Sequence, residues 1–410
     1  GGSGNDIVRA LAVDNSGNIY VVATFIGTIV VGSNTYTSTA GTQDILLLKL
    51  NSVGALQWSK HYGSSGSETP VCLAIDSLGN IIIAGDFSGT CNFGGSDVTA
   101  PQTTDCFIAK YDNSGNYLWA RTFGASETDN LSSVACDTLN NIIVCGTFAG
   151  TINVGGMSLS SNQGAYDTFV VKYPPGTAPT APNATFATHF ADLGGGDKGL
   201  GVAVNKNDNS IIITGFTDSG GLDFGGGRLL DSGGYIVKLN SSLAYQPGLS
   251  WGFMRSKNNA GKINCVAVDS AGDVYVAGYF TKKTDVGAPV IGTSGTIVTG
   301  TATQGFEMYL AKYSGGTGAG LWARGIVGDS TSVTGFLAVD PDKNAILVGT
   351  FQGTYNFGSN RVMSSQNTII SNGFAAKYDT NGNIKWAQNF GVFETSLNAN
   401  SGTSAVAVNQ

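Results

Sequence analysis

The chain contains two histidines, His61 and His189, so a serine or cysteine nucleophile that needs an imidazole base would have to use one of them. Both lie three residues after an aromatic residue in matching segments, Trp58 and Phe186. Because no cysteines cluster with them, they do not make a zinc site of the usual spacing. We interpret both as surface residues of an outer strand. We expect no catalytic residue, no organic cofactor and no enzymatic activity.

A second group of candidate site residues is acidic. Counting back eight residues from a repeated Asp or Asn gives Asp6, Glu68, Asp129 and Asp197 in the first four units of the chain. If their connectors reach one rim of a central channel, these carboxylates form a partial acidic ring that attracts calcium or a basic partner. The alternative, which we favour, is that each side chain accepts hydrogen bonds from the backbone of its own connector.

Six lysines and six aromatic residues also recur at matching positions, and we favour a structural role for both sets over a functional ring. A lysine stem can lie along a sheet with its amine at the edge, and a large ring can anchor the packing of neighbouring sheets. The lysines are Lys49, Lys110, Lys172, Lys238, Lys312 and Lys377, and the aromatic residues are Trp58, Trp119, Phe186, Trp251, Trp322 and Trp386.

No repeat position holds a cysteine in every unit, and the six cysteines form no C-x-x-C pair. Cys136 and Cys145 fall on the two arms of a predicted hairpin, in an offset register. A disulfide between them is an alternative, but we favour buried, reduced cysteines that act as small apolar side chains.

The elements that position all these residues come from an internal repeat. The segment LAVD at 11–14 returns in six further copies, at spacings of 62, 61, 68, 64, 71 and 69 residues. Three more segments follow each of the first six copies, for example NIIIAGDF, DCFIAKY and YLWARTFG in the second unit. Short β-branched runs joined by turns that contain Asp, Asn and Gly are typical of antiparallel strands covered on both faces. We therefore predict four strands, arranged as two hairpins, in each unit.

Composition agrees with many short strands joined by turns. Glycine makes up 60 of the 410 residues and charged residues 12%, which are about twice and about half their average shares. A hydrophobic share of 41% excludes a disordered chain, and a net charge of −7 argues against a nucleic-acid partner. No apolar run approaches the roughly 20 residues that span a bilayer, so we expect no direct membrane insertion.

Together these segments follow the patterns G-G-x-G-x-D, A-V-D-x-x-G-N-I-Y-V-x-G and D-x-F-x-x-K-x-D-x-x-G-x-x-x-W, most completely over residues 63–124. The chain thereby resembles the bacterial secreted β-propeller repeat family often described as seven-bladed. The resemblance implies an all-β propeller of four-stranded antiparallel blades and an extracellular or cell-surface location. It implies no common activity.

We predict a single β-propeller domain over residues 1–410. Its six complete units span about 1–62, 63–124, 125–191, 192–255, 256–327 and 328–391, and a partial seventh unit spans 392–410. Because the seventh unit holds a first segment only, we expect the chain to be a window of a longer protein that completes a seven-bladed ring. Unit three departs from the pattern by inserting PPGTAPTAPNA before its last strand.

We expect a non-enzymatic extracellular scaffold that serves adhesion or assembly in a cell-surface or filament protein. The long segments between the second and third strands vary most, so we expect a protein or glycan to bind there, on the loop-rich face. Other domains of the same longer chain are further candidate partners. The alternative is a carbohydrate-active or quinone-dependent propeller enzyme, which a deep central pocket would indicate.

Overall fold

The computed structural model of the chain describes residues 2, 4–100, 104–125, 129–162, 165–191, 195–218, 222–229, 232–255, 261–280, 283–284, 298–299, 307–330, 332–359, 361–365, 371–390 and 406–407. Its regular elements are 36 strands and one short 3₁₀ helix, η1 (Thr39–Gly41). The predicted seventh unit, 392–410, lies outside the described residues except for Val406 and Ala407.

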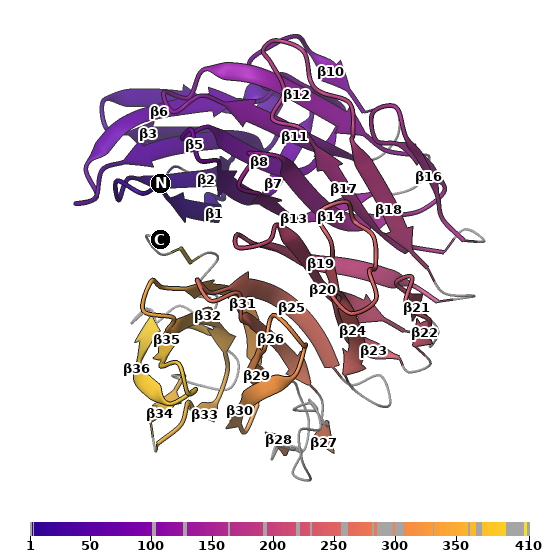
Figure 1. Cartoon of the computed structure of the whole chain (residues 1–410). Coiled ribbons are helices and arrows are strands. Elements are labelled where there is room, and N and C mark those ends of the chain that lie inside the picture. The colour runs from indigo at the N-terminus through magenta and orange to yellow at the C-terminus, as the bar shows by residue number, and fades with distance from the viewer. Residues whose placement is uncertain are drawn as a thin grey trace. The chain divides into compact units, whose positions relative to one another are not determined.

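Each repeat unit forms an antiparallel sheet in which the four predicted segments pair in chain order (Figure 1). The predicted fold, a β-propeller of four-stranded antiparallel blades, is confirmed. Blade 1 contains β1 (Ile7–Val13), β2 (Ile19–Phe25), β5 (Asp44–Leu50) and β6 (Leu56–Tyr62). Blade 2 contains β7 (Ser67–Ile75), β8 (Ile81–Ser88), β11 (Asp105–Tyr111) and β12 (Tyr117–Phe123). Blade 3 contains β13 (Asn130–Cys136), β14 (Ile142–Phe148), β17 (Asp167–Tyr173) and β18 (Phe186–Phe190).

The next three blades follow the same order. Blade 4 contains β19 (Asp197–Asn205), β20 (Ser210–Thr217), β23 (Gly233–Leu239) and β24 (Trp251–Arg255). Blade 5 contains β25 (Gly261–Val268), β26 (Val274–Phe280), β29 (Glu307–Tyr313) and β30 (Gly320–Gly328). Blade 6 contains β31 (Ser332–Val339), β32 (Ala345–Phe351), β35 (Asn372–Tyr378) and β36 (Ile384–Phe390).

The segment between the second and third strands of each blade is a two-stranded hairpin rather than an irregular loop. These hairpins are β3 (Thr28–Val31) with β4 (Asn34–Thr37), β9 (Thr90–Cys91) with β10 (Val98–Thr99), β15 (Thr151–Asn153) with β16 (Ser158–Ser160), β21 (Leu222–Asp223) with β22 (Arg228–Leu229), β27 (Lys283–Thr284) with β28 (Val298–Thr299), and β33 (Thr354–Asn356) with β34 (Val362–Ser364).

The hairpins contact fourth strands, and that of blade 6 also joins the neighbouring blade: β33 pairs with β30 of blade 5, so the sheet of blade 5 has six strands. In blade 1, the Tyr36 hydroxyl donates to the carbonyl of Ser59 on β6 at 2.9 Å. In blade 6, Asn389 on β36 donates to the carbonyl of Ser364 on β34 at 3.1 Å. In the other blades the fourth strand is an edge of its sheet, and an edge that a second element covers is protected from pairing with other chains.

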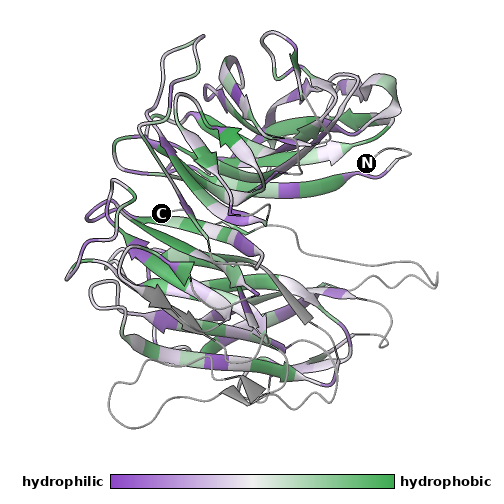
Figure 2. Cartoon of the chain, turned by 90° about the vertical axis from the view of Figure 1, so that its right-hand side faces the viewer, coloured by the Kyte–Doolittle hydropathy of each residue, from purple (hydrophilic) through white to green (hydrophobic). Residues whose placement is uncertain are grey.

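The chain divides into two compact units, one formed mainly by residues 1–202 and the other by residues 203–408. Within each unit, neighbouring blades share a buried apolar layer. Trp119 of blade 2 packs in one cluster with Leu131 of blade 3, and Ile326 of blade 5 in another with Phe351 of blade 6. In Figure 2 the hydrophobic colour follows the strands, as expected for strands covered on both faces.

A glycine follows the fourth strand because a buried carboxylate on the third strand leaves no space there for a side chain. A Cβ atom at Gly63 would lie 2.5 Å from Cγ of Asp44, and one at Gly124 would lie 2.4 Å from Oδ1 of Asp105. No side chain fits in that space. The Asp that begins the third segment and the Gly that ends the fourth are therefore one packing unit.

All six cysteines lie in the described part of the chain, and none forms a disulfide. Cys145 pairs in register with Ser133, and Cys136 pairs with Ile142, so the two thiols of this hairpin are offset as predicted. Cys72, Cys91, Cys106 and Cys145 are buried, while Cys136 and Cys265 are half-buried. Burial of these four cysteines bears out the prediction that most of the six act as small apolar side chains.

Candidate functional site

The Asp that ends the first segment closes the first turn of its blade. In blade 2, Oδ1 of Asp76 accepts hydrogen bonds from the backbone N–H groups of Leu78 and Asn80, at 3.0 and 2.9 Å. Its other oxygen accepts from the Asn80 side chain at 2.9 Å. The same turn recurs at Asp14, Asp137, Asp269 and Asp340. An Asx turn of this kind satisfies backbone donors that a tight hairpin would leave without partners.

The repeated lysines bind these aspartates. Among the described residues, five of the six lysines lie within ion-pair distance of a carboxylate. The pairs are Lys110 with Asp76 at 3.0 Å, Lys172 with Asp137 at 2.8 Å, Lys238 with Asp208 at 3.2 Å, Lys312 with Asp269 and Asp273 at 3.1 Å each, and Lys377 with Asp340 at 2.7 Å. Asp208 serves in blade 4 because Asn205 stands in the usual position. These pairs confirm the structural role predicted for the lysines.

The ion pairs shift the pKa values of their members. Burial favours the neutral form of Asp137, but hydrogen bonds from Lys172 and Asn141 outweigh it and hold the carboxyl pKa below its ordinary value. Burial likewise opposes the charged form of Lys312, yet hydrogen bonds with Tyr275 and two aspartates raise its pKa. An amine held in its charged form in this way is not available as a base or nucleophile near neutral pH.

Lysine and tryptophan together join blade 1 to blade 2, blade 2 to blade 3, and blade 4 to blade 5. In blade 1 the amine of Lys49 and the indole N–H of Trp58 both donate to the carbonyl of Asn113, in the last turn of blade 2, at 3.4 and 3.2 Å. Lys110 and Trp119 donate to Pro175 of blade 3, and Lys238 and Trp251 to Gly315 of blade 5. We call this shared acceptor arrangement the blade clasp.

A glycine in the receiving turn completes the clasp by leaving room for the indole ring. A Cβ at Gly115, Gly318 or Gly382 would lie between 2.6 and 3.0 Å from the ring of the preceding blade's tryptophan. The predicted role as packing anchors is confirmed for Trp58, Trp119, Trp251 and Trp322, whereas Trp386 is 39% exposed. Phe186 of blade 3 has no N–H to donate and is exposed.

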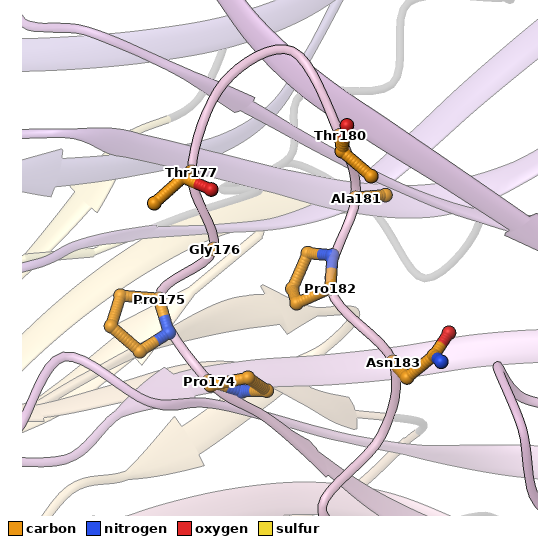
Figure 3. A pocket seen from close by; sticks show the side chains of 8 residues that line it. All are labelled: Pro174, Pro175, Gly176, Thr177, Thr180, Ala181, Pro182 and Asn183. Carbon is orange, nitrogen blue, oxygen red and sulfur yellow. The ribbon is translucent and has the colours of Figure 1, made fainter.

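The inserted loop of blade 3 is bound to blade 2 rather than projecting freely. Arg121 on β12 donates to the carbonyls of Pro182 and Ala181 at 3.0 and 3.2 Å. The two arms of the loop, seen in Figure 3, enclose an open hollow of about 550 Å³ lined by Pro174–Thr177 and Thr180–Asn183. Its lining carries no titratable side chain, so it offers no acid, base or charged ligand group.

The acidic candidate residues lie on the connectors that enter the first strands, and the structure gives them different environments. Asp6 is exposed, whereas Glu68, Asp129 and Asp197 are buried. The backbone N–H of Gly2 donates to Asp6, and that of Ala125 donates to Asp129 at 2.5 Å, each four residues away on the same connector. Asp129 also accepts from Ala149 at 3.3 Å. Asp6 and Asp129 thus accept hydrogen bonds from the backbone of their own connectors, as the alternative that we favour predicts. The acidic ring stays a prediction.

Among the described residues, no group of three or more His, Cys, Asp or Glu side chains could hold a metal ion. The described residues also include no helix long and apolar enough to cross a membrane.

Glu68 is a buried carboxyl group with an unusual pKa. Neither of its oxygens has a hydrogen-bond partner of ordinary geometry. Burial raises the carboxyl pKa to about 8, the nearby Asp44 raises it further, and the adjacent Cys91 thiol lowers it in part. At neutral pH this group is therefore mostly protonated, and neutral carboxyl groups are weak cation ligands.

We expect Glu68→Gln to make the protein less sensitive to alkali. Because the carboxyl pKa is raised on folding from 4.5 to about 8, the folded state binds the proton more tightly, and stability falls as pH rises through this window. Relaxation of the site around the ionised carboxylate reduces this loss of stability, and we expect the Glu68 contribution between pH 5 and pH 8.5 to be about 2 kcal/mol. Urea unfolding at pH 5 and pH 8.5 measures it, and the variant should lose about 2 kcal/mol less than the parent.

The comparison of variant with parent is needed because a second carboxyl group titrates in the same range. Burial raises the pKa of Asp86 to about 7, against a hydrogen bond from the Leu131 backbone N–H. Asp86 is present in both proteins, so its contribution cancels. Equal pH dependence of Glu68→Gln and parent would contradict the assignment of a raised pKa to Glu68.

His61 is half-buried and bonded to a carboxylate, in contrast to the surface position predicted for it. Its Nε2 lies 2.6 Å from Oδ2 of Asp44, which also accepts from the Thr39 backbone N–H at 2.8 Å. The rings of Phe25 and Tyr36 pack on the imidazole. No serine or cysteine in the described part of the chain hydrogen-bonds to His61, so the pair lacks the nucleophile of a catalytic triad.

His189 is also half-buried, and no hydroxyl or thiol among the described residues contacts it as a nucleophile would. Its ring meets that of Phe148 edge to face, and burial lowers its pKa. The matching positions of His61 and His189 in blades 1 and 3 therefore serve packing in different ways.

The outward residues of the hairpins form an exposed surface that combines recurring and variable positions, and we call it the hairpin surface. Ile152 and Leu159 of blade 3 point inward, while the residues that alternate with them are exposed. On the outer side, hydroxyl groups pair across the two strands. These pairs are Thr28 with Thr37, Thr90 with Thr99, Thr151 with Ser160, and Thr354 with Ser364, all at 2.9 to 3.0 Å.

The hairpins are held rigidly at their bases. Gly27, Gly150 and Gly353 have positive φ angles of 78–81°, and each donates its N–H to a serine hydroxyl at the other end of its hairpin. Rigid bases with variable outer residues are typical of binding surfaces, because little conformational entropy is lost on binding.

Comparison with known proteins is consistent with the propeller fold without assigning a family. The chain is 24% identical over 421 residues to an uncharacterized WD repeat-containing protein of Acanthamoeba polyphaga mimivirus, covering 85% of this chain and 29% of that protein. It is also 24% identical over 416 residues to the regulatory protein FlaEY of Caulobacter vibrioides, covering 93% and 40%. The chain thus spans well under half the length of either relative. No family model matches it.

Solved structures give only distant similarity. The β-propeller domain of the trilobed protease from Pyrococcus furiosus aligns with a TM-score of 0.41 and 8% identity, covering 96% of this chain and 98% of that one. Quinohemoprotein alcohol dehydrogenase from Comamonas testosteroni aligns with a TM-score of 0.40 and 11% identity, covering 99% and 70%. At these values neither structure carries an argument about activity.

Proposed function

We propose that the protein is a non-enzymatic scaffold that binds a protein partner through the hairpin surface of blades 1 to 3. The observation that carries this proposal is the division of the repeat into constant and variable parts. The constant lysines, aspartates and tryptophans are used in holding blades together. Beyond the recurring Thr/Ser pairs, outward hairpin residues are exposed and differ between blades, as Val30 and Thr35 in blade 1 differ from Asn153 and Ser158 at the matching positions of blade 3. Similarity to a WD repeat-containing protein supports a propeller of the protein-binding kind.

The same contacts argue against an enzyme. The repeated amines are held in ion pairs, and His61 bonds to Asp44 without a neighbouring nucleophile. The inserted loop of blade 3 lines an open hollow without titratable groups. We further propose, from the resemblance of the repeat to secreted bacterial propellers, an extracellular or cell-surface location with a role in adhesion or assembly.

The test exchanges the hairpins while leaving the blades intact. In the hairpin variant, residues 28–37 and 151–160 are interchanged. The composition of the chain is kept and the fold should be retained, but the exposed residues of the hairpins in blades 1 and 3 change places. In the control variant, Leu78 and Leu139 are replaced by Ala; both are exposed in turns at the other end of the blades. Each protein is immobilised and exposed to an extract of the source cells, and any captured protein is then purified and titrated by calorimetry.

We expect the purified partner to bind the parent and the control equally, and the hairpin variant at least about tenfold more weakly. Equal binding to all three proteins would contradict the proposed surface. Capture of a glycan in place of a protein would contradict the proposed class of partner.

A further inference from the structure

Glu68 lies where three segments of the chain meet. Its backbone N–H donates to the carbonyl of Gln43, just before β5 of blade 1, at 2.9 Å. Its own carbonyl accepts from the Gln43 side chain at 2.9 Å. The thiol of Cys91, on β9 of the blade 2 hairpin, lies beside its carboxyl group. Blade 1, the strand that enters blade 2 and the blade 2 hairpin are therefore all in contact around this side chain.

Several oxygen atoms around this point are buried acceptors without donors. Glu68, Asp44 and Cys91 are all fully buried. Among the described residues, neither carboxyl oxygen of Glu68 has a hydrogen-bond partner of ordinary geometry, and Oδ1 of Asp44 has none. The other oxygen of Asp44 accepts from His61 and from the Thr39 backbone N–H. An ionised Glu68 would thus add a second buried negative charge with no donor to solvate it.

The other charged groups of the surrounding strands do not neutralise such a charge. Arg9 on β1 donates to Gln43 at 3.5 Å, and Lys49 lies at the far end of β5. Asp86 on β8 faces the opposite side of the sheet, where it accepts from the backbone of blade 3. Asp97, on the hairpin, is exposed and negative. Strands β2 and β13, which also pack on β7, carry no charged residue.

The hairpin is the part of this junction that can move at the lowest cost. Its strands β9 and β10 contain two residues each. Two backbone bonds connect it to the segment that precedes β7, from Gly66 to Thr90 at 2.9 Å and from Gly63 to Asn92 at 3.2 Å. Strand β7, in contrast, pairs with β8 along Ser67–Ile75. Short elements with few backbone bonds open at a lower free energy than core strands do.

We propose that Glu68 is a proton-controlled latch for the blade 2 hairpin, closed while its carboxyl group is protonated and opened when that group ionises. In the closed form the carboxylic acid lies against the Cys91 thiol and the Asp44 carboxylate. Ionisation places two carboxylates together, and water reaches them where the hairpin lifts away from the blade. The latch acts on the hairpin itself and does not depend on the proposed function.

The direction of the pH dependence follows from the proton affinity of the closed form. Burial raises the pKa of Glu68 to about 8, with the Cys91 thiol lowering it in part and Asp44 raising it, whereas a hydrated carboxyl group in the open form has the ordinary value of 4.5. The closed form is therefore most favoured below pH 4.5 and loses stability as pH rises to about 8. Opening should increase over this range and level off above it.

Reaction of Cys91 with a pyridyl disulfide measures the opening, because the thiol is buried in the closed form. The parent, Glu68→Gln and Asp97→Asn each receive short pulses of the reagent at pH values from about 5.5 to about 8.5, which cover the range of the latch. Mass spectrometry then quantifies the labelled peptides. Gln keeps the shape of the protonated acid and a hydrogen-bond donor. Asp97→Asn is the matched control, because it removes a negative charge from the exposed side of the same hairpin. Cys145, buried in blade 3, reports on opening elsewhere.

Rates are compared between proteins at each pH, so that the pH dependence of thiol reactivity cancels. We expect the Cys91 rate of the parent, divided by that of Glu68→Gln, to rise at least about tenfold from the lowest to the highest pH. Asp97→Asn should follow the parent, and Cys145 should label equally in all three proteins. Circular dichroism melting curves check folding. Glu68→Met, neutral but without a donor, is a second variant that should behave as Glu68→Gln does.

Two results would overturn the proposal. One is the same pH dependence of Cys91 labelling in the parent and in both neutral variants, since ionisation of Glu68 would then not control the hairpin. The other is labelling of Cys145 in step with Cys91, because the blades would then open as a whole rather than at the hairpin.

Discussion

Replacing Lys110 by Met is expected to lower the free energy of unfolding by about 3 to 5 kcal/mol. The amine of Lys110 and the carboxylate of Asp76 are both buried and lie 3.0 Å apart, and the amine also donates to Pro175 of the next blade. Removal of the lysine leaves a buried carboxylate without its counter-charge, and that is the costly step. Urea unfolding at pH 7 followed by tryptophan fluorescence measures the change.

Two variants separate the ion pair from general effects of losing a lysine. Lys49→Met removes the equivalent lysine of blade 1, which lies over the Tyr20 ring at 5.0 Å and has no carboxylate partner among the described residues; we expect a loss of at most about 1 kcal/mol. Lys110→Met with Asp76→Asn removes both charges and keeps the turn, as Asn205 does in blade 4. This double variant should be more stable than Lys110→Met, and the opposite order would refute the explanation.

Replacing Trp119 by Ala is expected to cost about 3 to 5 kcal/mol as well. The ring fills the apolar layer between blades 2 and 3, and its indole N–H donates to the carbonyl of Pro175 at 3.3 Å. Truncation leaves a cavity that two packed sheets cannot close and a buried carbonyl with one donor fewer. Thermal and urea unfolding would both report the loss.

The controls for Trp119 distinguish ring volume from hydrogen bonding. Trp119→Phe keeps most of the ring volume, as Phe186 does in blade 3, but removes the indole N–H. The lost hydrogen bond to Pro175 should lower the free energy of unfolding by about 1 kcal/mol. Trp386→Ala should cost about 1 to 2 kcal/mol because that ring is partly exposed. Equal losses for Trp119→Ala and Trp386→Ala would be inconsistent with the blade clasp.

The sequence alone predicts the four strands of each blade, because every copy of the repeat carries the same pattern of strands and turns. The β-branched runs such as Ile81–Ile83 require two covered faces, and the Asp and Gly of each turn set where strands end. The offset of Cys136 and Cys145 followed from the same hairpin register. Local chemistry and global fold agree at these positions, so a single sequence is informative there.

The contacts between strands far apart in sequence were not predicted. The pairing of Lys110 with Asp76 joins the first and third strands, and only the joint recurrence of a lysine with an Asp or Asn in every unit hinted at it. The burial of Glu68 and the bond of His61 to Asp44 depend on how connectors and hairpins pack, which no period in the sequence encodes. The sequence does not predict the hairpins, because their strands are only two to four residues long and too short to show an alternating pattern.

We propose that the repeated polar residues hold the blades together and leave the hairpin surface for recognition. Brief acetylation of the native protein, followed by peptide mass spectrometry, tests it across the chain at once. Lys110, Lys172, Lys238 and Lys312 are buried in ion pairs and should label far more slowly than the exposed Lys198 and Lys206. Labelling of these four lysines as fast as Lys198 would show that the repeated amines are open to solvent and would contradict the claim.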